Sequence, residues 1–149
     1  MTQTQRHTTA NPYEVQFGYS RAIRRGPFIF VSGTTSIDPT TGVVQHPESA
    51  YEQTLKIFTE IIHAIEALGG TRQDVTRVRM FVTADEDTDD VGRALKENFG
   101  EVGPAATMIV GAKFVRAEMK VEIEADAIEL DCRNLNAIIT DNSKVGSSK

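Results

Sequence analysis

Three carboxylates alternate with apolar residues in the stretch KVEIEADAIEL, residues 120–130. Read with a period of two, Glu122, Glu124 and Asp126 lie on one side, and the other side carries Val121, Ile123, Ala125 and Ala127. This alternation is typical of a β-strand with one buried face. Carboxylates spaced in this way are about 7 Å apart and repel one another. The acidic row must therefore face water, a partner's arginines or a substrate.

A second strand is predicted over DVTRVRMFVT, residues 74–83. Its buried face would carry Val78, Met80 and Val82, while Arg77, Arg79 and Phe81 would point the other way. One interpretation pairs these arginines with the acidic row, across strands or between subunits, at a few tenths to about 1 kcal/mol per pair. The other leaves one carboxylate free for chemistry in a cleft, with a pKa set by its neighbours. The spacing leaves both open.

Size and charge favour a single ordinary domain. The chain has 149 residues, of which 40% are hydrophobic and 25% charged, with a net charge of −5 and a pI of about 5.2. An acidic chain is poorly suited to generic binding of nucleic acid or an anionic membrane. The first ten residues, MTQTQRHTTA, contain no apolar core of a signal peptide, and no apolar run reaches membrane-spanning length. We therefore expect a cytoplasmic protein without nucleic-acid or membrane partners.

Metal and cofactor motifs are absent from the sequence. The single cysteine, Cys132, has no partner for a disulfide within the chain, and His7, His46 and His63 are too widely separated to form a ligand motif. No CxxC, Walker, GxGxxG or GxSxG pattern occurs. We expect neither a metal nor a cofactor.

The remaining elements can be placed from turn and capping signals. Residues 1–12 are polar and are predicted to be loose, and residues 19–23 and 28–32 form a hairpin that turns at 25–27. DPTTGVV predicts a turn and a short strand. Ser49 and Glu52 form a capping box for a helix that ends at Gly69, with an apolar stripe of Tyr51, Leu55, Phe58, Ile62 and Ile65.

A second helix follows the acidic run DEDTDD, with Val91, Leu95 and Phe99 on its packed face, and ends at Gly100. Strands over AATMIVGAKF and MKVEIEADAIEL complete the order β-β-β-α-β-α-β-β. We predict an α+β sandwich, a mixed β-sheet with two helices packed on one face. The uncovered face carries mixed charge and an aromatic, and such a surface invites self-association.

The ordered set YSRAIRRGPFIFVSGTTSIDPTTG, EQTLKIF, DVTRVRMFVT, GPAATMIV and VEIEADAI resembles the RidA family, also called YjgF/YER057c/UK114 or L-PSP-like. The resemblance covers roughly residues 15–131, and it divides the chain into a flexible segment 1–14, the RidA-like domain 15–131 and a C-terminal extension 132–149. It implies a chorismate-mutase-like fold that forms a homotrimer with sheets inside, helices outside and ligand clefts between subunits. Members of the family hydrolyse imines and enamines such as 2-aminoacrylate to a 2-keto acid and ammonia.

Several family site positions are present. By resemblance, Tyr19, Ser32, Gly33 and Thr107 would line the cleft, and Glu122 would hold or activate the attacking water. The family arginine that grips the substrate carboxylate is replaced by Ala106, and the family asparagine after Val91 is replaced by Gly92. Arg79 or Arg77 could supply charge from another direction, and Arg116 and Glu118 are further candidates in the loop before the last strand.

Three functions are weighed on this basis. The first is an enzyme in which Glu122 acts as acid or base on an imine, an enamine or a related keto compound, with weak or absent 2-aminoacrylate (2-iminopropanoate) deaminase activity because Ala106 replaces the arginine. The second is a non-catalytic trimer that binds a metabolite or regulates a partner. The third, ribonuclease activity, is disfavoured by the net charge of −5 and by the lack of a suitable histidine pair.

Overall fold

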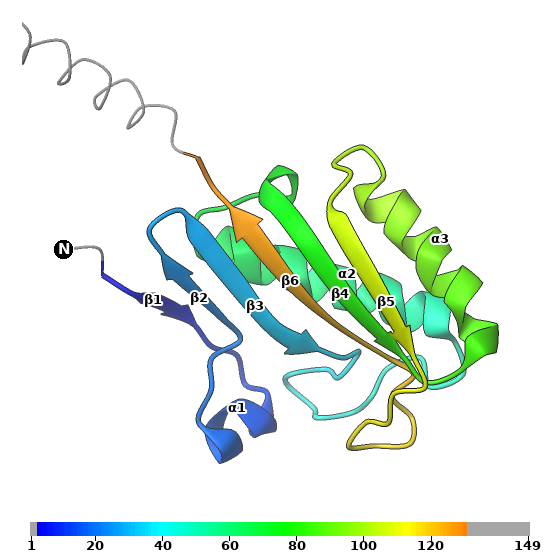
Figure 1. Cartoon of the computed structure of the whole chain (residues 1–149). Coiled ribbons are helices and arrows are strands. Elements are labelled where there is room, and N and C mark those ends of the chain that lie inside the picture. The colour runs from blue at the N-terminus through cyan, green and yellow to red at the C-terminus, as the bar shows by residue number, and fades with distance from the viewer. Residues whose placement is uncertain (1–2, 131–149) are drawn as a thin grey trace, which may run out of the picture.

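The computed structural model describes residues 3–130, which form one sheet and its helices (Figure 1). The strands are β1 (Gln5–His7), β2 (Ala22–Arg25), β3 (Phe28–Thr34), β4 (Val75–Val82), β5 (Ala105–Val110) and β6 (Val121–Ile128). The helices are α1 (Pro12–Phe17), α2 (Ala50–Ala67) and α3 (Thr88–Phe99), with short 3₁₀ turns at Arg72–Asp74 and Asp85–Asp87. The predicted α+β class is confirmed.

The sheet is mixed, in the order β1-β2-β3-β6-β4-β5. All neighbouring strands are antiparallel except β4 and β5, which run parallel. The last strand, β6, therefore lies in the interior of the sheet between β3 and β4. This position carries the acidic row into the middle of the sheet's second face.

Helix α2 begins and ends where its signals predict. Ser49 Oγ accepts a hydrogen bond from the backbone N–H of Glu52 at 3.1 Å, and Gly69 adopts a positive φ of 84° just after the helix. The buried stripe is wider than predicted, because Ile57 and Ile61 are fully buried while Tyr51 and Leu55 are only partly buried. A helix lying flat on a sheet buries a broad face rather than a narrow seam.

Helix α3 packs beside α2. The rings of Phe58 and Phe99 meet edge to face, with centroids 5.0 Å apart. The predicted buried residue Val91 is inaccessible, and Gly100 caps the helix as expected. The inward faces of β4 and β6 close this core with the residues that alternation predicted.

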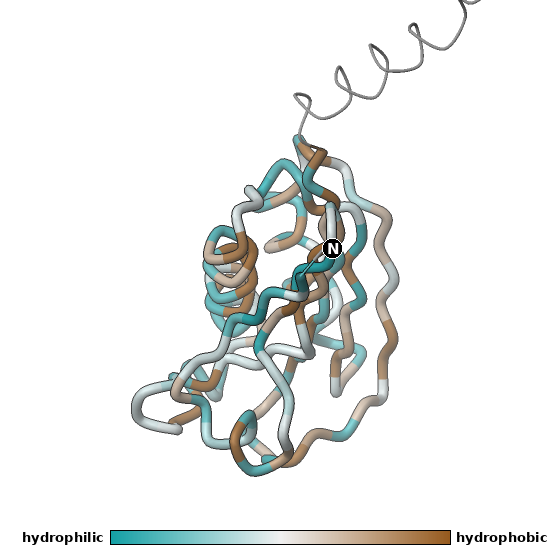
Figure 2. Tube along the Cα trace, turned by 90° about the vertical axis from the view of Figure 1, so that its left-hand side faces the viewer, coloured by the Kyte–Doolittle hydropathy of each residue, from teal (hydrophilic) through white to brown (hydrophobic). Residues whose placement is uncertain are grey.

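The two long helices cover only one side of the sheet. In the edge-on view of Figure 2, the helical layer lies to one side of the strands. On the other side, Phe28 and Phe30 of β3 stack on each other and remain 47% and 44% exposed. Ile109 of β5 is also half exposed. The predicted open face is therefore present in the described chain, and it carries apolar side chains.

The N-terminal segment differs from its prediction. Residues expected to be loose contain β1, which pairs with β2, and the start of α1. A polar sequence can occupy an edge strand because its backbone supplies the hydrogen bonds. Helix α1 is set by local capping, since the Asn11 side chain accepts from the Tyr13 N–H at 3.0 Å and Pro12 is placed in the first turn.

Two further predictions need correction. The strand expected after DPTTG is reduced to a single bridge between Ile37 and Val44, because the chain leaves the sheet at this point. The first hairpin strand begins at Ala22 rather than Tyr19, since Gly18 ends α1 and the chain must turn before it pairs. Cys132 and the C-terminal extension lie outside the described residues.

Candidate functional site

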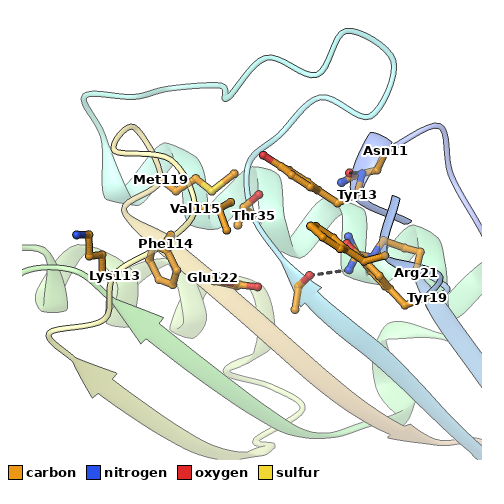
Figure 3. Close-up of a pocket in the computed structure, with 12 residues that line it drawn as sticks. Asn11, Tyr13, Tyr19, Arg21, Thr35, Lys113, Phe114, Val115, Met119 and Glu122 are labelled. Carbon is orange, nitrogen blue, oxygen red and sulfur yellow. Dashed lines mark hydrogen bonds between the residues drawn. The ribbon is translucent and has the colours of Figure 1, made fainter. Parts of the chain in front are cut away.

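Glu122 lines a cavity of about 240 Å³ at one end of the sheet (Figure 3). The walls come from α1, from the segment before β2, from the adjoining ends of β3 and β6, and from the loop that joins β5 to β6. They comprise Asn11, Tyr13, Phe17, Tyr19, Arg21, Gly33, Thr35, Lys113, Phe114, Val115, Met119 and Glu122. The cavity therefore combines one carboxylate, two cations and a largely apolar and aromatic wall.

The absence of a side chain at Gly33 determines where the Glu122 carboxylate can lie. β3 and β6 are neighbours, and their register slips between Val31 and Thr34, next to the glycine. A Cβ built on Gly33 would collide with Glu122 Oε1. Glycine thus leaves room for the carboxylate to lie over the backbone of β3.

The pKa of Glu122 is raised above its ordinary value, chiefly because burial penalises the charged form. The nearby Arg21 opposes this shift, and the negative charge of Glu124 adds to it. A carboxyl group whose pKa is raised in a cavity keeps its proton to a higher pH than a free one and can exchange that proton with a bound molecule.

Tyr19 lies on the same wall and also has a raised pKa, again mainly because of burial. Its ring is 5.7 Å from the Arg21 guanidinium carbon, within the range of a cation–π contact. The phenol therefore stays protonated at neutral pH and can donate a hydrogen bond to a ligand.

Arg21 is a cavity residue that the sequence interpretation did not select. It is only 5% exposed, and its Nη2 donates to the Gly33 carbonyl at 2.6 Å. No motif marked it, because it is one of three arginines in YSRAIRRG and the other two look equally polar. Helix α1, which lines the same cavity, was not predicted either.

Ser32 and Arg79 line a different hollow, of about 310 Å³, on the open face of the sheet. Ser32 Oγ donates to the Ser20 carbonyl at 2.7 Å. Arg79 Nη1 lies 3.2 Å from a Glu124 oxygen and 3.3 Å from an Asp126 oxygen. The interpretation that pairs the acidic row with an arginine therefore holds for Glu124 and Asp126, and Glu122 is the acidic residue of the row that lines the cavity.

Ala106 and Thr107 lie on β5, at the edge of the sheet, and both are exposed. β4 separates them from β6, since Thr107 pairs with Arg79 and Arg79 pairs with Glu124. A single chain therefore does not bring these two positions to the Glu122 cavity. Tyr19, Gly33 and Glu122 are the predicted site residues that it does bring together.

The loop that forms the cavity's lip is tied down at two points. Arg116 Nη1 donates to the Gly42 carbonyl at 2.7 Å, and the Glu118 carbonyl accepts from Gln53 Nε2 at 2.7 Å. These two candidates therefore hold the loop that presents Phe114 and Val115 to the cavity.

Within residues 3–130, no three potential metal ligands gather in one place. In the same part of the chain, none of the helices combines the length and apolar character needed to cross a membrane.

Comparisons with known proteins match most of the chain. The family model described as "Endoribonuclease L-PSP" matches residues 9–129. An uncharacterized protein of Streptomyces coelicolor is 34% identical over 120 residues, which cover 80% of this chain and 87% of the relative. A RutC family protein of Pyrococcus abyssi is 34% identical over 110 residues, covering 74% and 84%.

Solved structures agree. A member of the YjgF/YER057c/UK114 family from Mycobacterium tuberculosis superimposes with a TM-score of 0.76 at 30% identity, covering 85% of this chain and 99% of the other. The YjgF gene product of E. coli gives a TM-score of 0.73 at 25% identity, covering the same shares of each chain.

Proposed function

The chain belongs to the L-PSP family, that of the RidA and YjgF/YER057c/UK114 proteins, and from this premise we propose that it hydrolyses a small imine or enamine, or acts on a related keto compound, in the Glu122 cavity. The observation that carries the proposal is the placement of Glu122, a carboxyl group with a raised pKa in a cavity with apolar walls. Activity on 2-aminoacrylate or 2-iminopropanoate is expected to be weak or absent.

The chemistry needs one proton carrier and one water. With an enamine, protonated Glu122 donates its proton to the enamine carbon and becomes a carboxylate, and the substrate becomes an iminium ion. The carboxylate then accepts a proton from water as the water oxygen adds to the iminium carbon. The resulting carbinolamine collapses to a keto compound and ammonia. Imine hydrolysis is intrinsically easy, so positioning and one carboxyl group can suffice.

The proposal includes a homotrimer with the cavities opening into clefts between subunits. Two features support the trimer. The first is the open face, where Phe28, Phe30 and Ile109 are exposed, because such an apolar surface suits a second copy of the chain. Ala106 and Thr107 on β5 lie outside the cavity of their own chain, so they would reach a Glu122 cavity only from a neighbour.

The expected weakness toward 2-aminoacrylate follows from Ala106. In related enzymes an arginine at this position binds the substrate carboxylate, and alanine offers no such donor. Losing a buried charged contact costs several kcal/mol, roughly 2–5 kcal/mol. This same feature favours the second candidate, a trimer that binds a metabolite without turning it over. Ribonuclease activity, which the family description names, remains disfavoured by the net charge of −5.

An imine-hydrolysis assay tests the proposal. An amino-acid oxidase generates imines from several amino acids, semicarbazide traps what remains, and wild type, Glu122→Gln and Ala106→Arg are compared. Activity in wild type that is lost in Glu122→Gln supports the enzyme. A silent wild type with a gain in Ala106→Arg would point to another natural ligand, and silence in all three would favour the binding protein.

A further inference from the structure

A buried arginine without an anionic partner lies in the wall of the cavity. Arg21 is only 5% exposed, yet it takes part in none of the ion pairs between residues 3 and 130. A buried charge is costly unless it is paired. Arg24 and Arg79, by contrast, each have a carboxylate within 3.3 Å.

The hydrogen bonds of Arg21 are incomplete as well. Its Nη2 donates to the Gly33 carbonyl, but its Nε is buried and has no partner among the described residues. A guanidinium carries five N–H donors and is charged at every relevant pH. The guanidinium lies near the Tyr19 ring and the Glu122 carboxyl, but it has no ion pair and its Nε donor is unused among the described residues.

The cavity as a whole is short of negative charge. In the view of Figure 3 the Glu122 carboxyl lies between the Arg21 guanidinium and the Lys113 side chain. Lys113 likewise takes part in none of the ion pairs of the described residues. Arg21, the exposed Lys113 and one carboxyl group, that of Glu122, line the cavity, and the raised pKa of this carboxyl group moves it toward its neutral form. An anionic ligand would restore the balance.

We propose that Arg21 is the specificity-determining residue of this cavity and that it binds the carboxylate of a small organic acid. The ligand is small because about 240 Å³ is less than the roughly 300–1,000 Å³ of pockets for drug-sized molecules. Its body is apolar or unsaturated, to fit the wall of Phe17, Phe114, Val115 and Met119. The carboxylate binds at the Arg21 end, and the reacting carbon lies near Glu122.

This inference deepens the proposed function and rests on the cavity being its ligand site. It also assigns carboxylate recognition to a donor from the start of the first hairpin of the same chain rather than to position 106 on β5, so the weakness toward 2-aminoacrylate expected from Ala106 holds only for a ligand bound at position 106. The competing explanation is structural: Arg21 would merely tie the Gly33 carbonyl to the hairpin. That role requires a donor at this position, but it predicts no preference among ligands.

A binding experiment separates the two explanations without relying on turnover. Isothermal titration compares 2-oxobutanoate with its neutral amide on wild type, Arg21→Gln, Arg21→Lys and the control Arg25→Gln. Arg25 is exposed, and the Arg25→Gln substitution removes the same charge from the same hairpin. Glutamine keeps a donor for the Gly33 carbonyl, and circular dichroism confirms the fold of each variant.

We expect wild type and Arg25→Gln to bind the acid at least about tenfold more tightly than the amide, because a hydrogen bond to a charged group contributes more than one to a neutral group. Arg21→Gln should abolish the preference, and Arg21→Lys should retain part of it. An undiminished preference in folded Arg21→Gln, or no preference in wild type, would overturn the proposal.

A second measurement covers failure of the glutamine variant to fold. The Nε–H signal of Arg21, assigned by its absence from Arg21→Lys, should shift when wild type is titrated with 2-oxobutanoate and not with the amide. An unmoved signal would also overturn the proposal. If the protein binds the acid selectively but hydrolyses no imine, the role of Arg21 is supported and the proposed catalysis is contradicted. If it hydrolyses imines but does not prefer the acid to the amide, the proposed catalysis is supported and the role of Arg21 is contradicted.

Discussion

The carboxylate of Glu122 lies against the backbone of Gly33, so closely that a methyl group on the glycine would collide with Oε1 and lie 3.2 Å from Cδ. The two residues are 89 positions apart in sequence, and the pairing of β3 with β6 brings them together. The Gly33 carbonyl also accepts from Arg21, so one peptide segment positions both charged groups of the cavity.

Gly33→Ala should therefore displace Glu122 and lower imine hydrolysis by at least about tenfold, since small shifts of a proton-transferring group are costly. Gly92→Ala is the matched control. A Cβ at Gly92 meets nothing within 4 Å in α3, and alanine favours a helix by about 1 kcal/mol over glycine. Assay and thermal unfolding of both variants check this: unchanged activity in Gly33→Ala would contradict the stated role of the glycine.

Glu122→Gln should stabilise the fold increasingly as the pH rises. Burial raises the folded-state pKa of Glu122 above the ordinary value of 4.5, so the carboxyl group of the unfolded state ionises first as the pH rises. Below about pH 4 the carboxyl group is protonated in both the folded and the unfolded state, so it does not reduce the free energy of unfolding. Above that pH the carboxyl group ionises in the unfolded state, and the free energy of unfolding falls until the pH passes the folded-state pKa. The difference in Tm between variant and wild type should grow from pH 4 to pH 8, and a constant difference would show that burial does not control this group.

Binding of a carboxylate ligand should strengthen as the pH falls through the folded pKa of Glu122, because protonation removes a like charge from the cavity. The other charged or titratable groups nearby are Arg21, Lys113, Tyr13, Tyr19, Glu14 and Glu124. The phenol of Tyr19 has a raised pKa and stays neutral over this range. Titration from pH 5 to pH 8 checks the trend, which should vanish in Glu122→Gln.

The ion pairs of Arg79 should contribute little. Its side chain is 38% exposed and the two carboxylates that it meets are partly exposed as well, so solvent screens both pairs. Asp126→Asn should lower the free energy of unfolding by less than about 1 kcal/mol, and by less still at high salt. Urea unfolding at two ionic strengths measures this change in the free energy of unfolding. A decrease of several kcal/mol would show that the Arg79–Asp126 pair is buried in an assembly.

The open face should mediate assembly. We expect a trimer by sedimentation equilibrium, and Phe30→Asp should dissociate it because a charge would enter an apolar contact. Val43→Asp is the control: Val43 is also an exposed apolar residue, but it lies in the loop after β3 rather than on the sheet. A wild-type monomer, or equal dissociation by both variants, would contradict the assignment of this face.

The sequence alone determined the local elements. Period-two alternation assigned the two faces of β4 and β6, and Ser49, Gly69 and Gly100 set the helix ends, since these signals depend on neighbours within a few residues. The ordered motifs also indicated the family that the comparisons then established. Edge strand β1 was missed because a polar segment shows no periodicity until another strand pairs with it.

Only the tertiary structure decided which charges share a cavity. Sequence spacing made Glu122, Glu124 and Asp126 look equivalent, yet the sheet register places Arg79 against two of them and turns the third over Gly33. In the same way, nothing in YSRAIRRG distinguished Arg21 from Arg24 and Arg25, and its burial appears only when α1, β3 and the β5–β6 loop surround it. Alternation along a strand is a local property of the backbone, whereas burial, pairing and pKa depend on contacts between segments far apart in the chain.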